Sequence, residues 1–412
     1  MKKIYVVIVF VIGFCLTAFA QEEESQDFGI RFNGYVKNDA FFDSRQNVTA
    51  REGHFLLWPK PEAPDVNQQD INARHNFNIL AVQSRISGEI TGPEALGAET
   101  SGKIEGDFFA QANDNINLFR LRHAFVRLSW ENTQLLTGQF WNPMFVTSCF
   151  PGTVSFNTGV PIQPFSRNPQ LRLTQNFGDF EVITAALAQR DYPSRIDEAV
   201  SSKFLRNSGT PDMHLQVHYN RSKLNTGAGM AYKTIVPRLV TEEEIKTNNA
   251  VGGLSAIAFA RLSLNPITIK IQAVSGQNAT DVLQISGFAV ESIQDDTDKR
   301  SYLPLRNMSL WADIHTNGGP FQFGLFAGYT KNRGTKQNII NDPDLIMGFG
   351  KNIASLYRIS PRILYSSGKL KFGLEGEYTS ATFGDGYNQK AIPINTHTVG
   401  NMRVMLSTYY QF

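Results

Sequence analysis

The stretch LFRLRHAFVRLSWENTQLLTGQFWNPM, residues 118–144, is the starting point for predicting how this chain folds. Two runs rich in β-branched, aromatic and alternating residues flank a two-residue polar break, which is the pattern of a β-hairpin. The alternation puts Arg120 and Arg122 on one face of the first run, and a tight turn would set Arg122 opposite Trp141. A soluble sheet buries its apolar face, whereas a membrane barrel turns that face to lipid and keeps a polar, often charged lumen. The hairpin fits either architecture, so the rest of the chain must decide.

The remaining residues of the hairpin make the prediction more detailed. Phe119, Leu121 and Phe125 are expected on the face opposite the two arginines, and Ala124 is expected opposite Gln139. Further along the same run, apolar residues fall on the arginine face. A β-bulge near the turn is therefore expected, because one extra residue re-aims the alternation.

The first twenty residues, MKKIYVVIVFVIGFCLTAFA, have the layout of a secretory signal peptide. Two lysines precede an apolar run, and Ala18-Phe19-Ala20 forms a small-x-small cleavage site. The expected domains are the signal peptide (1–20), a short periplasmic segment (21–28) and one transmembrane β-barrel (29–412). An N-terminal membrane anchor is the alternative, although the apolar run is short for one.

Charge and cysteine content exclude several classes of protein. Removal of the signal peptide leaves 37 basic and 37 acidic residues, so nothing indicates a nucleic-acid partner. Cys149 is then the one remaining cysteine, so an intrachain disulfide is excluded. After the signal peptide no run of ~18 apolar residues follows that would form a spanning helix. The 13 Tyr, 30 Phe and 33 Gly fit a β-barrel, but an ordinary secreted enzyme could share this composition.

Alternation along the chain predicts sixteen strands. Their expected ranges are 30–43, 77–90, 102–111, the two strands of the 118–144 hairpin, 170–177, 180–189, 213–220, 228–236, 254–263, 267–274, 307–315, 321–330, 354–365, 370–379 and 397–412. Residues 282–291 could form a further strand, but we assign them to a long loop.

The joins between these strands alternate in length. Those after even-numbered strands are short turns, and those after odd-numbered strands are mostly long, polar and rich in Pro, Asn and Asp. Short turns at one rim, long loops at the other and an even strand count are typical of bacterial outer-membrane barrels. The sheet is also expected to close into a barrel, since lipid cannot form hydrogen bonds with the backbone of an open sheet edge. The predicted fold is an all-β, 16-stranded antiparallel transmembrane barrel; a soluble sandwich is the alternative.

The end of the chain points the same way. Phe412, Tyr410, Thr408, Leu406 and Val404 share one face of the last strand, and the final residue is aromatic. This resembles the carboxy-terminal signature read by the outer-membrane assembly machinery, which would make that machinery a partner. A plain amphipathic edge strand is the alternative.

Three segments carry a resemblance to a known family. The residues GKIEGDFFAQ (102–111), RLRHAFVRL (120–128) and LLTGQFWNPMF (135–145) are similar to the DcaP-like outer-membrane porins. They depart from the family at Phe140 and at Asn142-Pro143, where small hydroxyl residues are more usual. The resemblance implies a sixteen-stranded barrel, a homotrimer in outer-membrane lipid, and passage of small organic anions such as dicarboxylates. The phosphate-selective porins look similar in general pattern, so phosphate remains an alternative.

The polar faces of the predicted strands supply the candidate pore lining. A pore selects by ringing its constriction with charge, and guanidinium groups suit carboxylate or phosphate. The candidate lining residues are Arg120, Arg122, Arg172, Arg85, Lys103, Asp107, Gln139, Trp141, Arg358, Arg362 and Arg403. Arg120 and Arg122 would lie ~7 Å apart, within reach of one anion.

The same faces also carry acids that could cancel this charge. They are Glu89, Glu105, Asp107, Glu375 and Glu377. If they pair with the arginines, the channel is neutral rather than an electrostatic funnel for anions. Asp107 is the acid expected to pair with an arginine of the following strand.

Residues 142–168 form the candidate pore-constricting loop. Its prolines and apolar residues would pack poorly in water, so we expect it to fold into the barrel; covering a neighbouring subunit is the alternative. Cys149 within it is interpreted as an incidental thiol.

The sequence favours a passive channel over an enzyme. No HExxH, P-loop or GxSxG motif occurs, and His214 and His218 would lie ~13 Å apart on a strand, too far for one zinc. We therefore expect no metal site and no cofactor. A non-selective general porin and a plugged structural or enzymatic barrel remain alternatives, while the chain is too short for a plugged importer of ~22 strands.

Overall fold

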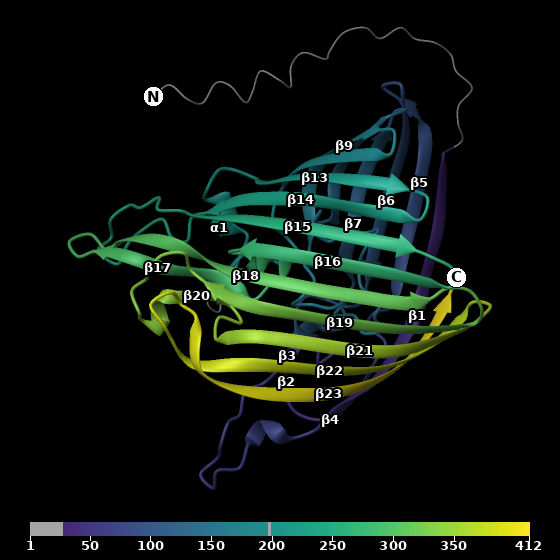
Figure 1. Cartoon of the computed structure of the whole chain (residues 1–412). Helices are drawn as coiled ribbons and strands as arrows, with labels where there is room; N and C mark the ends of the chain where they lie inside the picture. Colours follow the sequence, from purple (N-terminus) through teal and green to yellow (C-terminus); the bar gives the residue numbers. More distant parts are fainter. Residues whose placement is uncertain (1–27, 197–198) are drawn as a thin grey trace.

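The computed structural model describes residues 28–196 and 199–412, and its dominant feature is a barrel of sixteen antiparallel strands (Figure 1). The expected signal peptide and residues 21–27 lie outside the described part. The barrel strands are β1 (Gly29–Asp43), β5 (Arg85–Ala95), β6 (Ala98–Asp107), β7 (Arg120–Ser129), β8 (Thr133–Trp141), β9 (Arg167–Phe177), β10 (Phe180–Leu187), β13 (Asp212–Arg221), β14 (Leu224–Ile235), β15 (Val251–Ser263), β16 (Ile267–Gln277), β18 (Lys299–Thr316), β19 (Phe321–Gly334), β21 (Ile353–Ser367), β22 (Leu370–Tyr387) and β23 (Pro393–Gln411).

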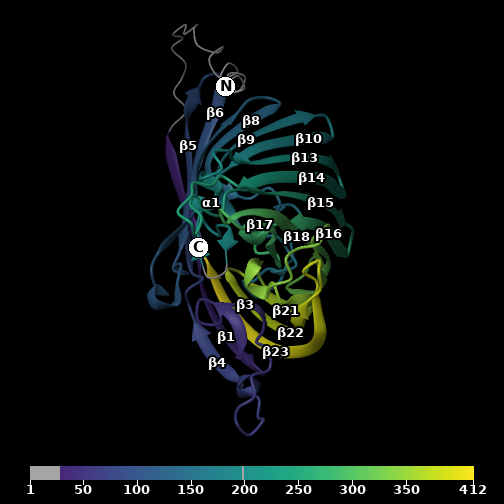
Figure 2. The same cartoon turned by 90° about the vertical axis from the view of Figure 1, so that its left-hand side faces the viewer.

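The sheet closes on itself between its first and last strands. Each barrel strand pairs with the next in sequence, and β1 pairs with β23 from Tyr35↔Gln411 to Asp43↔Arg403. Seen from the long-loop end, the strands surround a space that contains several loops (Figure 2). The predicted fold class and strand count are therefore confirmed.

The outer wall of the barrel is apolar and the inner wall is polar. On β22 and β23, Leu374 and Leu406 are 48% and 55% exposed. Their chain neighbours Glu375, Met405 and Ser407 are almost fully buried, and they point to the opposite face. A closed sheet that is apolar outside and polar inside is the arrangement of an outer-membrane barrel. Among the described residues, no helix is long and apolar enough to cross a membrane.

This arrangement makes a substitution on the lipid face costly. Leu406→Arg should lower the free energy of unfolding by about 2–4 kcal/mol, since an arginine midway along the lipid-facing wall loses its hydration. Asn176→Arg is the matched control, because Asn176 is exposed on the polar face beside Glu181. Urea titration in lipid vesicles would compare the two variants. Equal stabilities would contradict the assignment of the outer face.

Two strand predictions need correction. The expected strand 77–90 is broken, because residues 81–84 leave the ladder between β4 (Asn76–Leu80) and β5. Ser84 Oγ donates to Ala81 O there and forms a local turn. Residues 282–291 are not all loop, since β17 (Ser286–Gln294) pairs with β18 and with β20 (Ile346–Phe349). β4 continues the barrel strand of β5 along β1, whereas β17 and β20 add to the sheet beside β18, so the barrel count is unchanged.

The bulge predicted in the 118–144 hairpin exists, but it lies away from the turn. Glu105 pairs with His123 and Gly106 pairs with Leu121, so Arg122 is the extra residue. Phe125 consequently pairs with Lys103 on the polar face, and its expected place beside Leu121 was wrong.

The β7–β8 ladder corrects two further predictions. It ends at Ala124↔Gln139, so Arg122 and Trp141 are not ladder partners, although the Arg122 guanidinium lies over the Trp141 ring at 5.9 Å from its centroid. Gln139 shares a face with Ala124 and the exposed Ile104, which is the outer face rather than the pore lining. Its side-chain amide donates to Arg122 O at 3.0 Å, and so gives the carbonyl group at the bulge a hydrogen-bond partner.

Loops fill part of the barrel interior. The inward-folded segments include the hairpin of β2 (Asn47–Ala50) and β3 (Phe55–Pro59), the segment between β8 and β9, and the 3-10 turn Thr280–Val282. Their apolar side chains pack with inward residues such as Phe326 and Leu356. The remaining elements belong to the long-loop end: β11 (Arg195–Ile196), β12 (Ala199–Val200), α1 (Lys203–Arg206) and the 3-10 turns Ile71–Ala73, Asn113–Asn115 and Pro343–Leu345.

Candidate functional site

Three neighbouring strands carry a row of alternating charge on the inner wall. Arg85 of β5 pairs directly with Asp107 of β6, and Asp107 pairs directly with Arg120 of β7. Arg120 Nε donates to Asp107 Oδ1 at 2.8 Å, while Arg85 Nη2 lies 3.8 Å from Asp107 Oδ2. The expected bond between Asp107 and an arginine of the next strand is thus present.

The bulge adds a second arginine to this row. Arg122 Nη1 donates to Asp107 Oδ2 at 2.9 Å, and Arg122 Nε donates to Glu105 Oε1 at 2.7 Å. Lys103 Nζ completes the set, 3.1 Å from Glu105 Oε2. The carboxylate of Asp107 therefore binds both Arg120 and Arg122. It occupies the position between them that was expected to receive a permeating anion.

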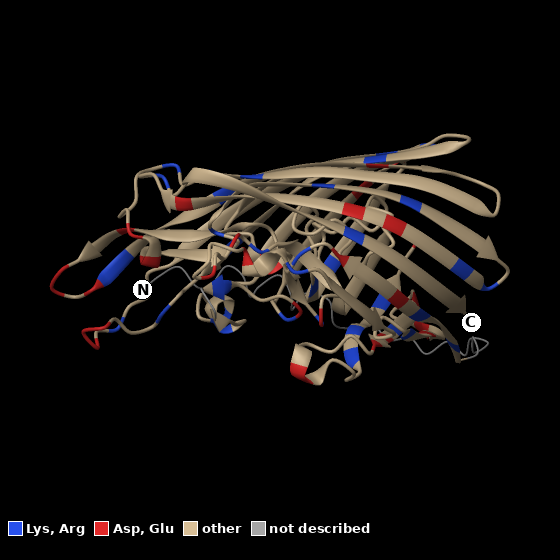
Figure 3. Cartoon of the chain, turned by 90° about the horizontal axis from the view of Figure 1, so that it is seen from below, with Lys and Arg blue, Asp and Glu red and all other residues tan. Residues whose placement is uncertain are grey.

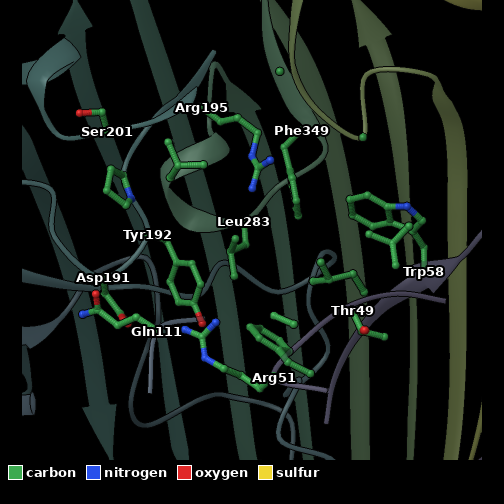
Figure 4. Close-up of a pocket in the computed structure, with 18 of the residues that line it drawn as sticks. Thr49, Arg51, Trp58, Gln111, Asp191, Tyr192, Arg195, Ser201, Leu283 and Phe349 are labelled. Atoms are coloured by element: carbon green, nitrogen blue, oxygen red, sulfur yellow. The ribbon is translucent and has the colours of Figure 1, made fainter. Parts of the chain in front are cut away.

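A cavity of about 1030 Å³ opens above this row at the long-loop end. We call it the vestibule. Its lining includes Arg51, Phe55, Trp58, Asp191 and Tyr192. Figure 4 shows the Tyr192 hydroxyl directed toward the Arg51 guanidinium, with Asp191 beside them.

Asp191 links the vestibule to the arginine row. Its Oδ2 accepts hydrogen bonds from Arg167 Nε at 2.9 Å and Nη2 at 2.6 Å, and its Oδ1 lies 3.7 Å from Arg120 Nη1. The Arg120 guanidinium also lies over the ring of Phe109, 4.9 Å from its centroid. Arg51 Nε donates to Phe109 O at 2.7 Å, which holds that side chain at the vestibule floor.

Several buried donors around Asp191 are unsatisfied. Arg120 Nη1 and Nη2, Arg167 Nη1 and the Tyr192 hydroxyl have no hydrogen-bond partner among the residues that the structure describes. Arg120 and Arg167 are 5% and 0% exposed. Buried donors without partners are costly, and oxygen atoms of an anion would satisfy them.

Positive charge exceeds negative charge in this region. We define the guanidinium cluster as Arg51, Arg85, Lys103, Arg120, Arg122 and Arg167 together with Glu105, Asp107 and Asp191. Six cations face three carboxylates, so the cluster carries a surplus of three positive charges. Figure 3 shows blue and red segments side by side on neighbouring strands of the barrel.

Burial sets the ionisation of the vestibule groups. It lowers the pKa of Arg51, whose charged form loses hydration, and it raises the pKa of Tyr192 with the Asp191 carboxylate adding to the effect. Burial acts to raise the pKa of Asp191 too, but the Arg167 and Arg120 guanidiniums outweigh it and hold that pKa below its ordinary value. Asp191 is therefore a carboxylate at neutral pH.

Three more predicted arginines are paired with acids: Arg358 and Arg362 of β21 lie on the far wall, whereas Arg403 of β23 lies next to β1, two strands from β5. Arg403 donates to Asp43 at 2.9 and 2.6 Å, and Arg362 donates to Asp313 at 2.8 and 3.0 Å. Arg358 Nε lies 3.3 Å from Glu377 Oε1. These pairs carry no surplus of positive charge, so they do not extend the cluster.

The far wall instead anchors the segment between β8 and β9, residues 142–166. Glu375 accepts from the backbone nitrogens of Val154 and Ser155 at 2.6 and 3.1 Å, and Arg358 Nη1 donates to Val160 O at 2.6 Å. The segment thus crosses from the β8–β9 edge to β21 and β22, inside the barrel. It contains no Asp, Glu, Lys, Arg or His.

Two predicted residues support this segment rather than line open space. Arg172 Nη2 donates to Trp141 O at 2.6 Å. The Trp141 ring stacks on Phe145 with centroids 4.0 Å apart, and Arg167 lies over its ring at 5.0 Å.

The sequence did not point to Arg51, Arg167, Asp191 or Tyr192. Strand alternation identifies inward residues only within regular strands. Arg51 and Asp191 lie in long loops, and Arg167 precedes the range predicted for its strand. The one available signal was the charged pair Arg190-Asp191 directly after the predicted strand 180–189.

No protein-family model matches the sequence, and no curated protein matches it. Solved structures are similar in fold. The outer-membrane channel DcaP of Acinetobacter baumannii superposes with a TM-score of 0.70 at 15% identity, covering 96% of this chain and 100% of that one. An anion-selective porin from Comamonas acidovorans gives 0.55 at 11%, covering 94% and 100%, and OmpT, an outer membrane protein of Vibrio cholerae, gives 0.56 at 9%, covering 93% and 98%. The resemblance expected from residues 102–145 is thus confirmed at the level of the fold.

Proposed function

We propose that this protein is an outer-membrane porin, a passive channel for small hydrophilic solutes that favours organic anions. The observation that carries the proposal is the guanidinium cluster, with three more cations than carboxylates and with unsatisfied donors at its upper end. In a narrow, poorly hydrated passage such a surplus raises the local anion concentration. Paired guanidinium donors suit carboxylate oxygens.

The cluster also lies between two cavities that a solute path would have to join. Arg51 lies in the vestibule, and Arg120 and Arg122 lie on the inner wall of β7. Arg85 and Glu105 line a smaller cavity of about 400 Å³ that also contains Phe412, at the short-turn end. The uncharged 142–166 segment narrows the bore from the opposite side, so a passing anion stays beside the cluster. Each step exchanges one guanidinium for the next, which keeps binding weak enough for release.

Other expectations rest on this proposal. We infer a homotrimer in outer-membrane lipid that passes dicarboxylates, in line with the family resemblance. Assembly through the terminal Phe412 and the absence of enzymatic activity, metal and cofactor stay predictions. Phosphate is the second candidate solute, since guanidinium groups bind it by the same paired contacts.

Planar-bilayer recording tests the proposal directly. Purified protein should insert with stepped conductance, and the reversal potential in a KCl gradient should show higher permeability for chloride than for potassium. Addition of succinate should reduce the chloride current in a saturable manner. A plugged barrel would give no steps, and a potassium preference would contradict the role of the cluster.

A further inference from the structure

Asp191 differs from the other carboxylates of the guanidinium cluster in where it comes from. Asp107 and Glu105 belong to β6 and are fixed in the barrel wall. Asp191 belongs to the loop between β10 and β13, which enters the barrel from the long-loop end. It is the one member of the three that also lines the vestibule.

Its contacts are those expected of a bound carboxylate ligand. One oxygen accepts two hydrogen bonds from Arg167, and the other lies near Arg120 Nη1. Arg51 also lies close enough to Asp191 for their charges to interact. A free carboxylate entering from the vestibule would bind these same guanidinium groups.

Arg120 and Arg167 have hydrogen-bond donors that Asp191 does not use. Its geometry leaves both Nη atoms of Arg120 and Nη1 of Arg167 without a hydrogen bond among the described residues, and the same holds for the Tyr192 hydroxyl. One carboxylate therefore does not saturate the site.

We propose that Asp191 is a tethered competitor, a specificity-determining residue whose carboxylate occupies part of the anion site and keeps permeating anions weakly bound. The inference rests on the proposed function and deepens it. Without a competitor, three guanidiniums at one place would hold a dicarboxylate tightly and slow its exit. With Asp191 present, an entering anion shares the donors, and Asp191 rebinds them as the anion moves on.

The test is Asp191→Asn, measured by bilayer recording with succinate as the probe. Asparagine keeps the shape and can still accept from Arg167, but it removes the negative charge. The chloride-to-potassium permeability ratio should rise by about threefold or more, since one opposing charge at close range is lost. The succinate concentration for half-maximal block should fall by a similar factor, and the blocked intervals should lengthen.

Asp298→Asn is the matched control. It removes one carboxylate that binds Arg238 and Arg300 in the outer loops, and it does not line the vestibule. Its permeability ratio and its succinate block should equal those of the unmodified protein. Asp191→Ser, which cannot imitate a carboxylate, should reproduce the effect of Asp191→Asn if that variant inserts poorly.

The outcomes separate this inference from the proposed function. If the unmodified channel prefers anions and Asp191→Asn weakens that preference or leaves it unchanged, Asp191 only positions the arginines and the competitor role is wrong. If the unmodified channel prefers cations, the proposed function fails, and a shift toward anions in Asp191→Asn would still support the competitor role.

Discussion

Replacing Arg120 and Arg122 together with alanine should strongly reduce the anion preference of the channel. The two guanidiniums neutralise Asp107 and contribute to neutralising Glu105. Their loss removes two of six cations and leaves four against three carboxylates in the cluster. Asp107 then keeps only the distant Arg85, 3.8 Å away, so a negative group faces the bore.

The surplus of positive charge falls from three to one, so the reversal potential in a KCl gradient should move most of the way toward zero. Arg221→Ala with Arg333→Ala is the matched control, because both side chains are exposed and neither belongs to the cluster. That control should keep the original reversal potential. Unchanged selectivity in the Arg120 and Arg122 variant would place the filter elsewhere in the barrel.

The same variant should lose stability, because breaking a buried pair leaves an uncompensated charge. Such losses cost about 3–5 kcal/mol. Heat-dependent migration in detergent gels reports whether the barrel is folded before any current is measured. Arg120→Lys with Arg122→Lys keeps the charge and should restore anion preference, which distinguishes electrostatics from misfolding.

Removal of the 142–166 segment should produce the largest change in conductance. Trp141 and Arg167 are directly paired residues of β8 and β9, so a two-residue Asn-Gly turn can join them. Removal of the segment opens the lumen toward β21 and β22, and the single-channel conductance should rise by roughly twofold or more, because a constriction dominates the resistance of a pore.

The matched control shortens a loop outside the barrel. Pro64 and Asp70 form a bridge, so residues 65–69 can be replaced by the same Asn-Gly turn. This control should conduct as the unmodified protein does. If the shortened 142–166 variant folds poorly, Phe156→Ala with Phe165→Ala should still raise the conductance, since both rings belong to the inner apolar cluster. No rise in either variant would show that the segment does not limit the current.

The barrel could be predicted because lipid imposes a two-residue period on every strand. Leu374, Leu406 and Ile363 must face lipid while their chain neighbours face the lumen, and this alternation is written in the sequence. Predictions of which residues face inward failed where a bulge interrupts the two-residue period. Arg122 at the bulge moved Phe125 to the inner face, and Gln139 fell on the outer face.

The candidate site was only partly predictable, because charge pairing depends on which strands and loops meet. Arg120 and Asp107 belong to neighbouring strands, so their bond followed from the strand order. Arg358, Arg362 and Arg403 looked equivalent to Arg120 in sequence, yet each is paired with an acid outside the cluster, and Arg358 also anchors the 142–166 segment.

By itself the sequence determined the sixteen strands, the alternation of short turns and long loops, and the inward-facing residues wherever the strands are regular, because all of these are local consequences of a two-sided wall in lipid. Only the tertiary structure decided which charges cancel and which remain. Arg51, Arg167 and Asp191 come from segments far apart in the chain, and only the closure of the barrel and the inward folding of its loops bring them to one place.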